Sequence, residues 1–124
     1  LSAIQSVYDQ LEGEAFRKAT YHLSSAEEIF VTGFQTVRGM AEDCSRRLGL
    51  ARSNVRYLSA HDSMLSEWIE DFSSRRSCLL VIDVVPYAGE CQTLAALAKE
   101  QGRSVVVVTD EYCHWAHDVA DAAP

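Results

Sequence analysis

The stretch CLLVIDVV, from Cys78 to Val85, is the segment that decides the fold. Every residue in it except Asp83 is apolar, and the apolar residues do not alternate with polar ones. Such a run is typical of a strand in a parallel sheet that is covered by helices on both faces. A second run, SVVVVTD from Ser104 to Asp110, has the same character and is expected to be a second fully buried strand. Two such strands with a helical pattern between them predict an α/β protein.

The patterns on either side of these runs alternate between helix and strand. The segments IFVTG, at 29–33, and NVRYLS, at 54–59, each predict a strand. Apolar residues at helical spacing predict helices around residues 4–11, 16–23, 37–48, 64–72, 91–98 and 115–120. Gly49 and Gly102 are expected to end the third and the fifth of these helices. This order predicts one doubly wound, flavodoxin-like α/β domain over residues 1–124, with a mostly parallel sheet, helices on both faces and a truncated final strand.

Composition limits the classes of function. The chain has 124 residues, of which 48% are hydrophobic, so it is long enough for one domain with a substantial core. Its net charge of −7 argues against a surface that binds nucleic acid, since such surfaces need clustered Lys and Arg. No apolar run approaches the roughly 20 residues of a membrane span. The chain begins with Leu1, so we expect it to be a fragment or a trimmed chain.

The four cysteines are expected to be reduced thiols in a cytoplasmic protein. None of Cys44, Cys78, Cys91 and Cys113 forms a C-x-x-C pair, and a chain with this much core needs no disulfide framework.

A doubly wound sheet binds its ligand beyond the carboxyl ends of its strands. Three loops lie there in the predicted fold: TGFQTVRG at 32–39, PYAGE at 86–90 and TDEYCHW at 109–115. The second loop leads into a helix, and a helix N-terminus can hold a phosphate. However, Pro86 removes one backbone donor from this loop and Glu90 adds a negative charge to it.

Several short motifs follow one another in an order that resembles a known family. They are Gly33 with Ala41, Gly89 in the second loop, AKEQG at 98–102, VVVVTD ending at Asp110, and WAHDVAD at 115–121. Together they span nearly the whole chain and are similar to the sugar isomerase (SIS) domain carried by RpiR-type bacterial transcription regulators. The resemblance implies an effector-sensing and oligomerising domain, a homodimer or higher homo-oligomer, that binds a carbohydrate-derived ligand without a cofactor. It also implies that DNA is contacted only by a helix-turn-helix domain on the N-terminal side, which we expect to be missing from this chain.

The resemblance also indicates which residues would bind the ligand. From the first loop they are Gly33, Gln35, Thr36 and Val37, and from the second loop Pro86, Tyr87, Ala88, Gly89, Glu90 and Cys91. In the family, hydroxyl groups at four of these positions help backbone N–H groups to hold the phosphate of a phosphosugar. Here those positions are Val37, Pro86, Ala88 and Cys91, so the matching hydroxyls are gone. We therefore expect either a changed ligand or a domain that has lost ligand binding and serves assembly.

Two other functions stay open. The first is a sugar-phosphate isomerase of the same fold, with Glu90 or His61 as the base. The second is a protein-interaction module without any small ligand. Either alternative would make the protein something other than a sensor.

Three local features bear on the chemistry. Cys113, His114 and His117 could contribute to a zinc site, but a second ligand pair is lacking and we expect no metal. Asp83 interrupts a buried strand, where a carboxylate needs a partner or a raised pKa. Cys91 at a helix N-terminus is expected to have a lowered pKa.

Overall fold

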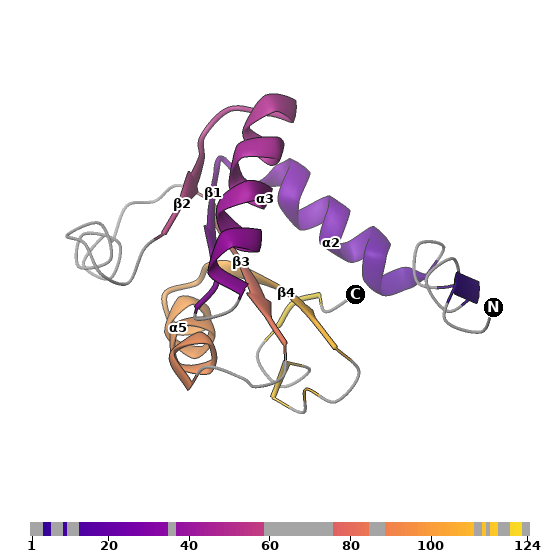
Figure 1. Ribbon diagram of the computed structural model, residues 1–124. Coiled ribbons are helices and arrows are strands. Elements are labelled where there is room, and N and C mark those ends of the chain that lie inside the picture. Colours follow the sequence, from indigo (N-terminus) through magenta and orange to yellow (C-terminus); the bar gives the residue numbers. More distant parts are fainter. Residues whose placement is uncertain are drawn as a thin grey trace.

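The structure is a computed structural model that describes residues 4–5, 9, 13–34, 37–58, 76–84, 89–110, 113, 115–116 and 120–122 (Figure 1). Its sheet has the strand order β2-β1-β3-β4, and all neighbours in this order are parallel. The strands are β1 (Glu28–Thr32), β2 (Val55–Tyr57), β3 (Ser77–Asp83) and β4 (Ser104–Thr109). The helices with printed bounds are α2 (Glu14–Ser25), α3 (Arg38–Ala51) and α5 (Gly89–Glu100). The predicted doubly wound α/β fold is confirmed.

Strand β3 lies at the centre of the sheet and all seven of its residues are buried. Alternate side chains of β3 enter two separate hydrophobic clusters. Leu79 and Val81 pack against α5, whereas Leu80 and Ile82 pack on the face that α2 and α3 cover. In Figure 1, α5 accordingly lies on the other side of the sheet from α2 and α3. An apolar run without alternation is what such a doubly covered strand requires.

The two glycines predicted to end helices behave differently. Gly102 has a φ of +78° just after α5, and the Arg103 N–H donates to the Ala98 carbonyl at 2.9 Å, which is a glycine helix end. The prediction for Gly49 is wrong, because α3 continues to Ala51. Arg52 is the C-cap residue of α3 and has an extended conformation. Its Nη1 donates a hydrogen bond to the Leu23 carbonyl at 2.7 Å.

Strand β4 differs from the expected fully buried strand. Val105, Val106 and Val107 are buried, but the side chain of Val108 is 41% exposed. Val108 shares a face with Val106, yet it lies nearer the carboxyl end, where no described helix covers it. Burial along β4 is therefore set by the reach of the covering helices as well as by its sequence.

Residues 120–122 lie along the outer edge of β4. Ala122 forms a parallel bridge with Val106, and the Val107 N–H donates to the Ala122 carbonyl at 3.0 Å. The Val105 N–H donates to Oδ2 of Asp121 at 2.7 Å. The predicted helix around 64–72 lies outside the described residues, as do most of the predicted helices around 4–11 and 115–120. Within the described parts of the chain, no helix is both long enough and apolar enough to span a bilayer.

Two of the motifs noted in the sequence meet in an ion pair. Lys99, from AKEQG, donates a hydrogen bond from Nζ to Oδ1 of Asp121, which closes WAHDVAD. Burial works to raise the pKa of Asp121, but the bonds from Lys99 and Val105 and the charges of Lys99 and His22 outweigh it. The pKa of Asp121 is consequently lowered. The ion pair therefore attaches residues 120–122 to the end of α5.

We predict that Asp121→Asn lowers the free energy of unfolding at pH 7 by about 1 kcal/mol, because it removes a half-exposed ion pair. The lowered pKa means that the pair stabilises the fold fully above the unfolded pKa of roughly 3.9, and that this contribution is lost as the pH falls through the folded pKa. Urea unfolding between pH 7 and pH 2 measures both effects. The wild type should lose stability more steeply below about pH 4 than the variant does.

The control is Glu14→Gln, because Glu14 pairs with Lys18 on the surface of α2 and both side chains are more than half exposed. We expect no change in stability from it. Parallel pH profiles for the wild type and Asp121→Asn would contradict the prediction.

Candidate ligand-binding site

The chain leaves the two central strands toward opposite faces of the sheet. Strand β1 leads to α3 on one face, and its neighbour β3 leads to α5 on the other. The loops diverge at this point, so it is where a doubly wound sheet opens a ligand crevice. Of the ten predicted ligand-binding residues, the structure describes Gly33, Val37, Gly89, Glu90 and Cys91. Gln35, Thr36, Pro86, Tyr87 and Ala88 lie outside the described residues.

Gly33 lies where β1, α3 and β3 come together. A Cβ atom built on Gly33 would lie 2.9 Å from Cβ of Ala41 and 3.2 Å from the carbonyl oxygen of Ile82. Both distances are shorter than ordinary van der Waals contacts, and neither neighbour is a flexible side chain. Glycine at this position lets α3 begin directly against the carboxyl end of β3.

We predict that Gly33→Ala lowers the free energy of unfolding by about 1–3 kcal/mol, the usual cost of an overpacked site. The matched control is Gly39→Ala in the first turn of α3, where an added Cβ would meet none of the described atoms within 4 Å. That change should be neutral or stabilise by up to about 1 kcal/mol, since alanine favours the helix. Chemical denaturation measures both variants, and equal effects would contradict this account of Gly33.

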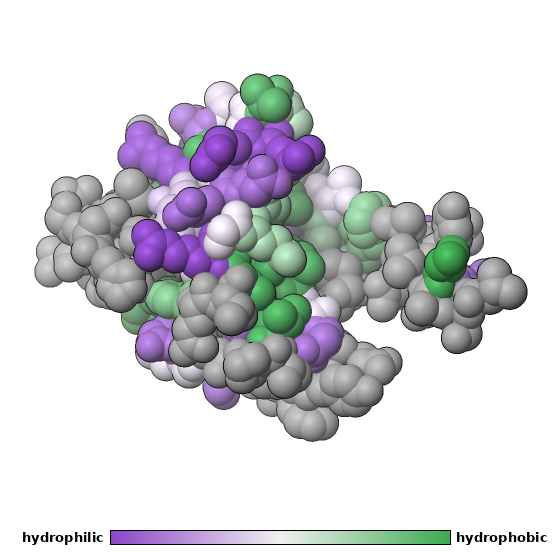
Figure 2. All heavy atoms as spheres, in the orientation of Figure 1, coloured by the Kyte–Doolittle hydropathy of each residue, from purple (hydrophilic) through white to green (hydrophobic). Residues whose placement is uncertain are grey.

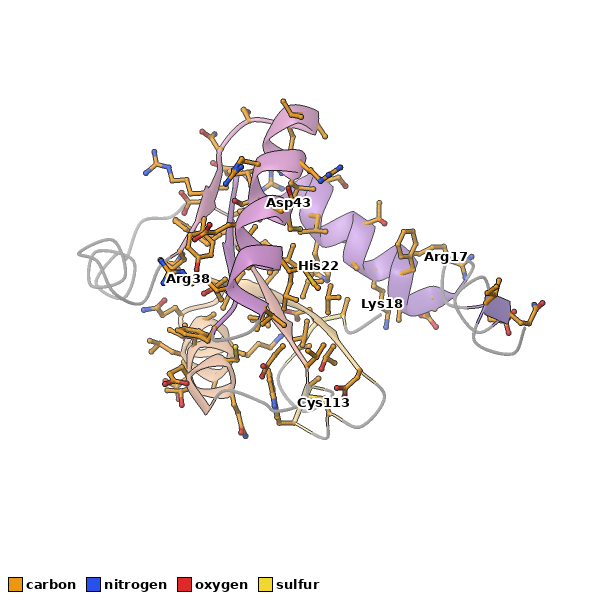
Figure 3. All side chains as sticks on the ribbon, in the orientation of Figure 1. Arg17, Lys18, His22, Arg38, Asp43 and Cys113 are labelled. Carbon is orange, nitrogen blue, oxygen red and sulfur yellow. The ribbon has the colours of Figure 1, made fainter. Side chains whose placement is uncertain are left out.

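The start of α3 supplies little to an anion. Val37 precedes the helix with its side chain buried in the core, and no side chain caps the helix. Arg38 lies at the first turn (Figure 3), but its Nε donates to Glu42 Oε1 at 3.3 Å. Figure 2 shows hydrophilic side chains gathered over α3, and two of them form a second pair along the helix, Arg47 with Asp43 at 2.8 Å. These cations are therefore engaged by acidic neighbours.

An acidic side chain lies beneath the first turn of α5. Asp83 is the last residue of β3, is only 1% exposed, and shares the α5 face of the strand with Leu79 and Val81. Cys91 packs on this face in the first turn of α5. The Asp83 carboxylate lies close enough to the Cys91 thiol to raise its pKa. The sequence had singled out both residues separately, but it gave no signal that they meet.

The environment of Cys91 is the opposite of the one expected from its place at a helix N-terminus. Burial raises the pKa of the Cys91 thiol to about 12, with further contributions from the charge and hydrogen bond of Asp83 and from Glu90 and Cys113. The expectation of a lowered pKa is therefore wrong. Figure 3 shows Cys113 at the same edge, beyond the ends of β3 and β4. The helix dipole is outweighed by desolvation and by nearby acidic groups.

We predict that Cys91 does not react with an aromatic disulfide reagent at pH 8 in the folded protein. A thiol of pKa about 12 is ionised to only about one part in ten thousand at that pH, and this one is also fully buried. Cys44, which is partly exposed, serves as the internal control and should react first. Peptide mapping of the labelled protein distinguishes the two sites. Labelling of Cys91 before Cys44 would contradict the prediction.

A hollow of about 210 Å³ lies at the amino-terminal ends of the strands, opposite the candidate ligand-binding site. It is lined by Tyr21, His22, Ser25, Ala26, Arg76, Ser77, Gly102 and Ser104. Several of its polar groups already have partners in the protein. Ser25 donates to the Tyr21 carbonyl at 2.6 Å, Ser77 Oγ accepts from Arg103 at 2.8 Å, and Arg76 lies 3.6 Å from Glu27. These contacts make the hollow a structural junction between α2 and the strands.

The remaining candidates from the sequence concern metal and acid–base chemistry. No group of three His, Cys, Asp or Glu residues in the described part of the chain could hold a metal ion. His61, His114 and His117 lie outside the described residues.

Comparison with known proteins supports the fold through structure alone. No protein-family model and no curated protein sequence matches the chain. The sugar isomerase domain of an RpiR transcription factor from Sphaerobacter thermophilus superposes with a TM-score of 0.78 at 19% identity over 89% of this chain. A hypothetical protein superposes with a TM-score of 0.68 at 19% identity over 98% of the chain. This chain spans 61% and 63% of the lengths of these two neighbours. The fold of this chain is thus that of the sugar isomerase domain of an RpiR-type regulator.

Proposed function

We propose that this chain is a single SIS domain that senses an effector and oligomerises within an RpiR-type transcription regulator. The observation that carries the proposal is the superposition on the sugar isomerase domain of an RpiR transcription factor, with a TM-score of 0.78. The motif order in the sequence points to the same family. DNA would be contacted by a separate helix-turn-helix domain on the N-terminal side, and the regulator would act in the cytoplasm.

The ligand is a carbohydrate derivative bound at the carboxyl edge of the sheet, between the loops that follow β1 and β3. The close approach of Gly33 to β3 supports this location, because it brings the two loops together at the point where the chain diverges. Gly89 begins α5 there, and an added Cβ at this glycine would meet no atom of the described residues within 4 Å. A ligand could therefore approach the backbone of α5 closely.

A sensory role is favoured over catalysis. The neighbour with the higher TM-score is a domain of a regulator, and a sensor needs only differential binding. An isomerase would need a base and a phosphate anchor. Glu90 is exposed in the first turn of α5, while Arg38, the nearest described candidate cation of the first loop, is paired with Glu42.

Assembly is proposed to use the N-terminal helices. Helix α2 extends away from the sheet toward the N-terminus (Figure 1). Its apolar side chains Phe16 and Tyr21 are 39% and 66% exposed. Burial of such side chains against a second copy of the chain would favour a homodimer.

We predict that a thermal-melt screen of the purified domain at low salt finds a stabilising carbohydrate among sugars, amino sugars, acid sugars and sugar phosphates. A ligand at about 100 times its Kd adds about 2.7 kcal/mol, which should raise the melting temperature of a domain of this size by several degrees. Gly89→Val is the test of location, because a branched side chain at the start of α5 should abolish the shift. Turnover of an aldose or ketose phosphate would instead favour an isomerase. Dimerisation without any shift would favour an interaction module.

A further inference from the structure

The hollow at the amino-terminal ends of the strands is lined by polar groups that can donate hydrogen bonds. Its volume of about 210 Å³ is below the roughly 300–1,000 Å³ of pockets that hold drug-sized ligands, so it suits a small molecule or ion. None of the described residues that line it is acidic, although the net charge of the chain is −7. Two of them, His22 and Arg76, can carry a positive charge. The hollow is therefore a basic region on an acidic protein.

Several hydrogen-bonding groups in the hollow are available to a ligand. The Tyr21 hydroxyl, the His22 imidazole and the Ser104 hydroxyl have no hydrogen bond to any described residue. The rings of Tyr21 and His22 meet edge to face with their centroids 5.4 Å apart, which fixes the two side chains relative to each other. Ser77 Oγ accepts a hydrogen bond from Arg103, so its own proton remains available. All of these groups can donate to an anion.

Arg76 has more donors than its one ion pair uses. Its Nε lies 3.6 Å from Oε1 of Glu27, and the two side chains are 73% and 51% exposed, so the pair is weak. The two Nη groups of Arg76 have no partner among the described residues. A guanidinium group binds a carboxylate or a phosphate through two parallel hydrogen bonds. Arg76 can therefore bind an anion in the hollow while Glu27 stays at Nε.

Acidic side chains lie around the hollow without lining it. Glu28 begins β1 beside Ser77, and Asp121 bonds to Lys99. Neither acidic residue is among those that line the hollow. Glu27 is thus the acidic side chain that competes with a ligand for the guanidinium group of Arg76.

We propose that this hollow is a binding site for a small anion that carries a carboxylate or phosphate group, held by the guanidinium of Arg76 and the hydroxyls of Tyr21 and Ser104. His22 completes the site from α2 (Figure 3). The lining residues come from α2 and from the starts of β3 and β4, so a bound anion joins the N-terminal helix to the sheet. The hollow lies opposite the proposed carbohydrate site, and the inference is independent of the proposed function.

The test is an NMR titration of the ¹⁵N-labelled domain at low salt, with inorganic phosphate and succinate as separate probes. We expect at least one probe to shift the backbone amide signals of His22, Gly102 and Ser104 until they saturate, while those of Gly33 and Gly89 stay unchanged. The probe that saturates at the lower concentration identifies the preferred anionic group. The absence of saturable shifts with both probes would overturn the inference. Shifts confined to Gly33 and Gly89 would also overturn it, because the anion would then bind at the carboxyl edge of the sheet.

Charge variants test the role of Arg76. Arg76→Gln should weaken binding at least about fivefold, because its hydrogen bonds to an anion are charge-assisted. Glu27→Gln should tighten binding about two- to fivefold, because it removes the competing carboxylate. The matched control is Arg47→Gln on α3, which removes the same charge from an exposed arginine that pairs with Asp43, and it should leave the affinity unchanged. All three substituted side chains are more than half exposed, so the variants are expected to fold.

Equal weakening by Arg76→Gln and Arg47→Gln would show that net charge alone governs binding and would overturn the site.

Discussion

The burial of β3 on both faces is the constraint on which the rest of the structure depends. A strand with apolar side chains on both faces needs a helical layer on each side, and parallel neighbours need crossovers to supply those layers. This requirement sends the chain from β1 to one face and from β3 to the other. The divergence of the chain after β1 and β3, where a ligand crevice is expected, follows from it. The one acidic residue of β3, Asp83, comes where the strand reaches the crevice.

The positions that match the SIS pattern hold elements of the fold together. Gly33 allows Ala41 of α3 to approach β1 closely, and Lys99 pairs with Asp121. Among the departures, the described side chains of Val37 and Cys91 are buried in the two hydrophobic clusters. Where the structure describes them, matches and departures alike therefore contribute to the core and its connections.

Much of the fold could be predicted from the sequence, since it depends on local pattern. The apolar runs placed β3 and β4, and Gly102 ended α5 as expected. The expectations that failed depended on distant contacts. The end of α3 is fixed by the contact of Arg52 with Leu23. The high pKa of Cys91 depends first on its burial and then on Asp83 in the preceding strand. For the candidate site, the sequence indicated the carboxyl edge of the sheet, which stays a prediction, and it gave no sign that a carboxylate lies beneath the first turn of α5.

Residues 120–122, which cover the outer edge of β4, affect how readily the protein aggregates. An uncovered edge of four consecutive valines would be a template for pairing with another chain. Here the Val105 N–H donates to the Asp121 carboxylate and the Val107 N–H donates to the Ala122 carbonyl. Protonation of Asp121 weakens this cover while much of the sheet can still be intact. Acid strong enough to protonate Asp121, whose pKa is lowered, is therefore expected to produce aggregates of near-native molecules, detectable by light scattering, before it produces unfolded monomers.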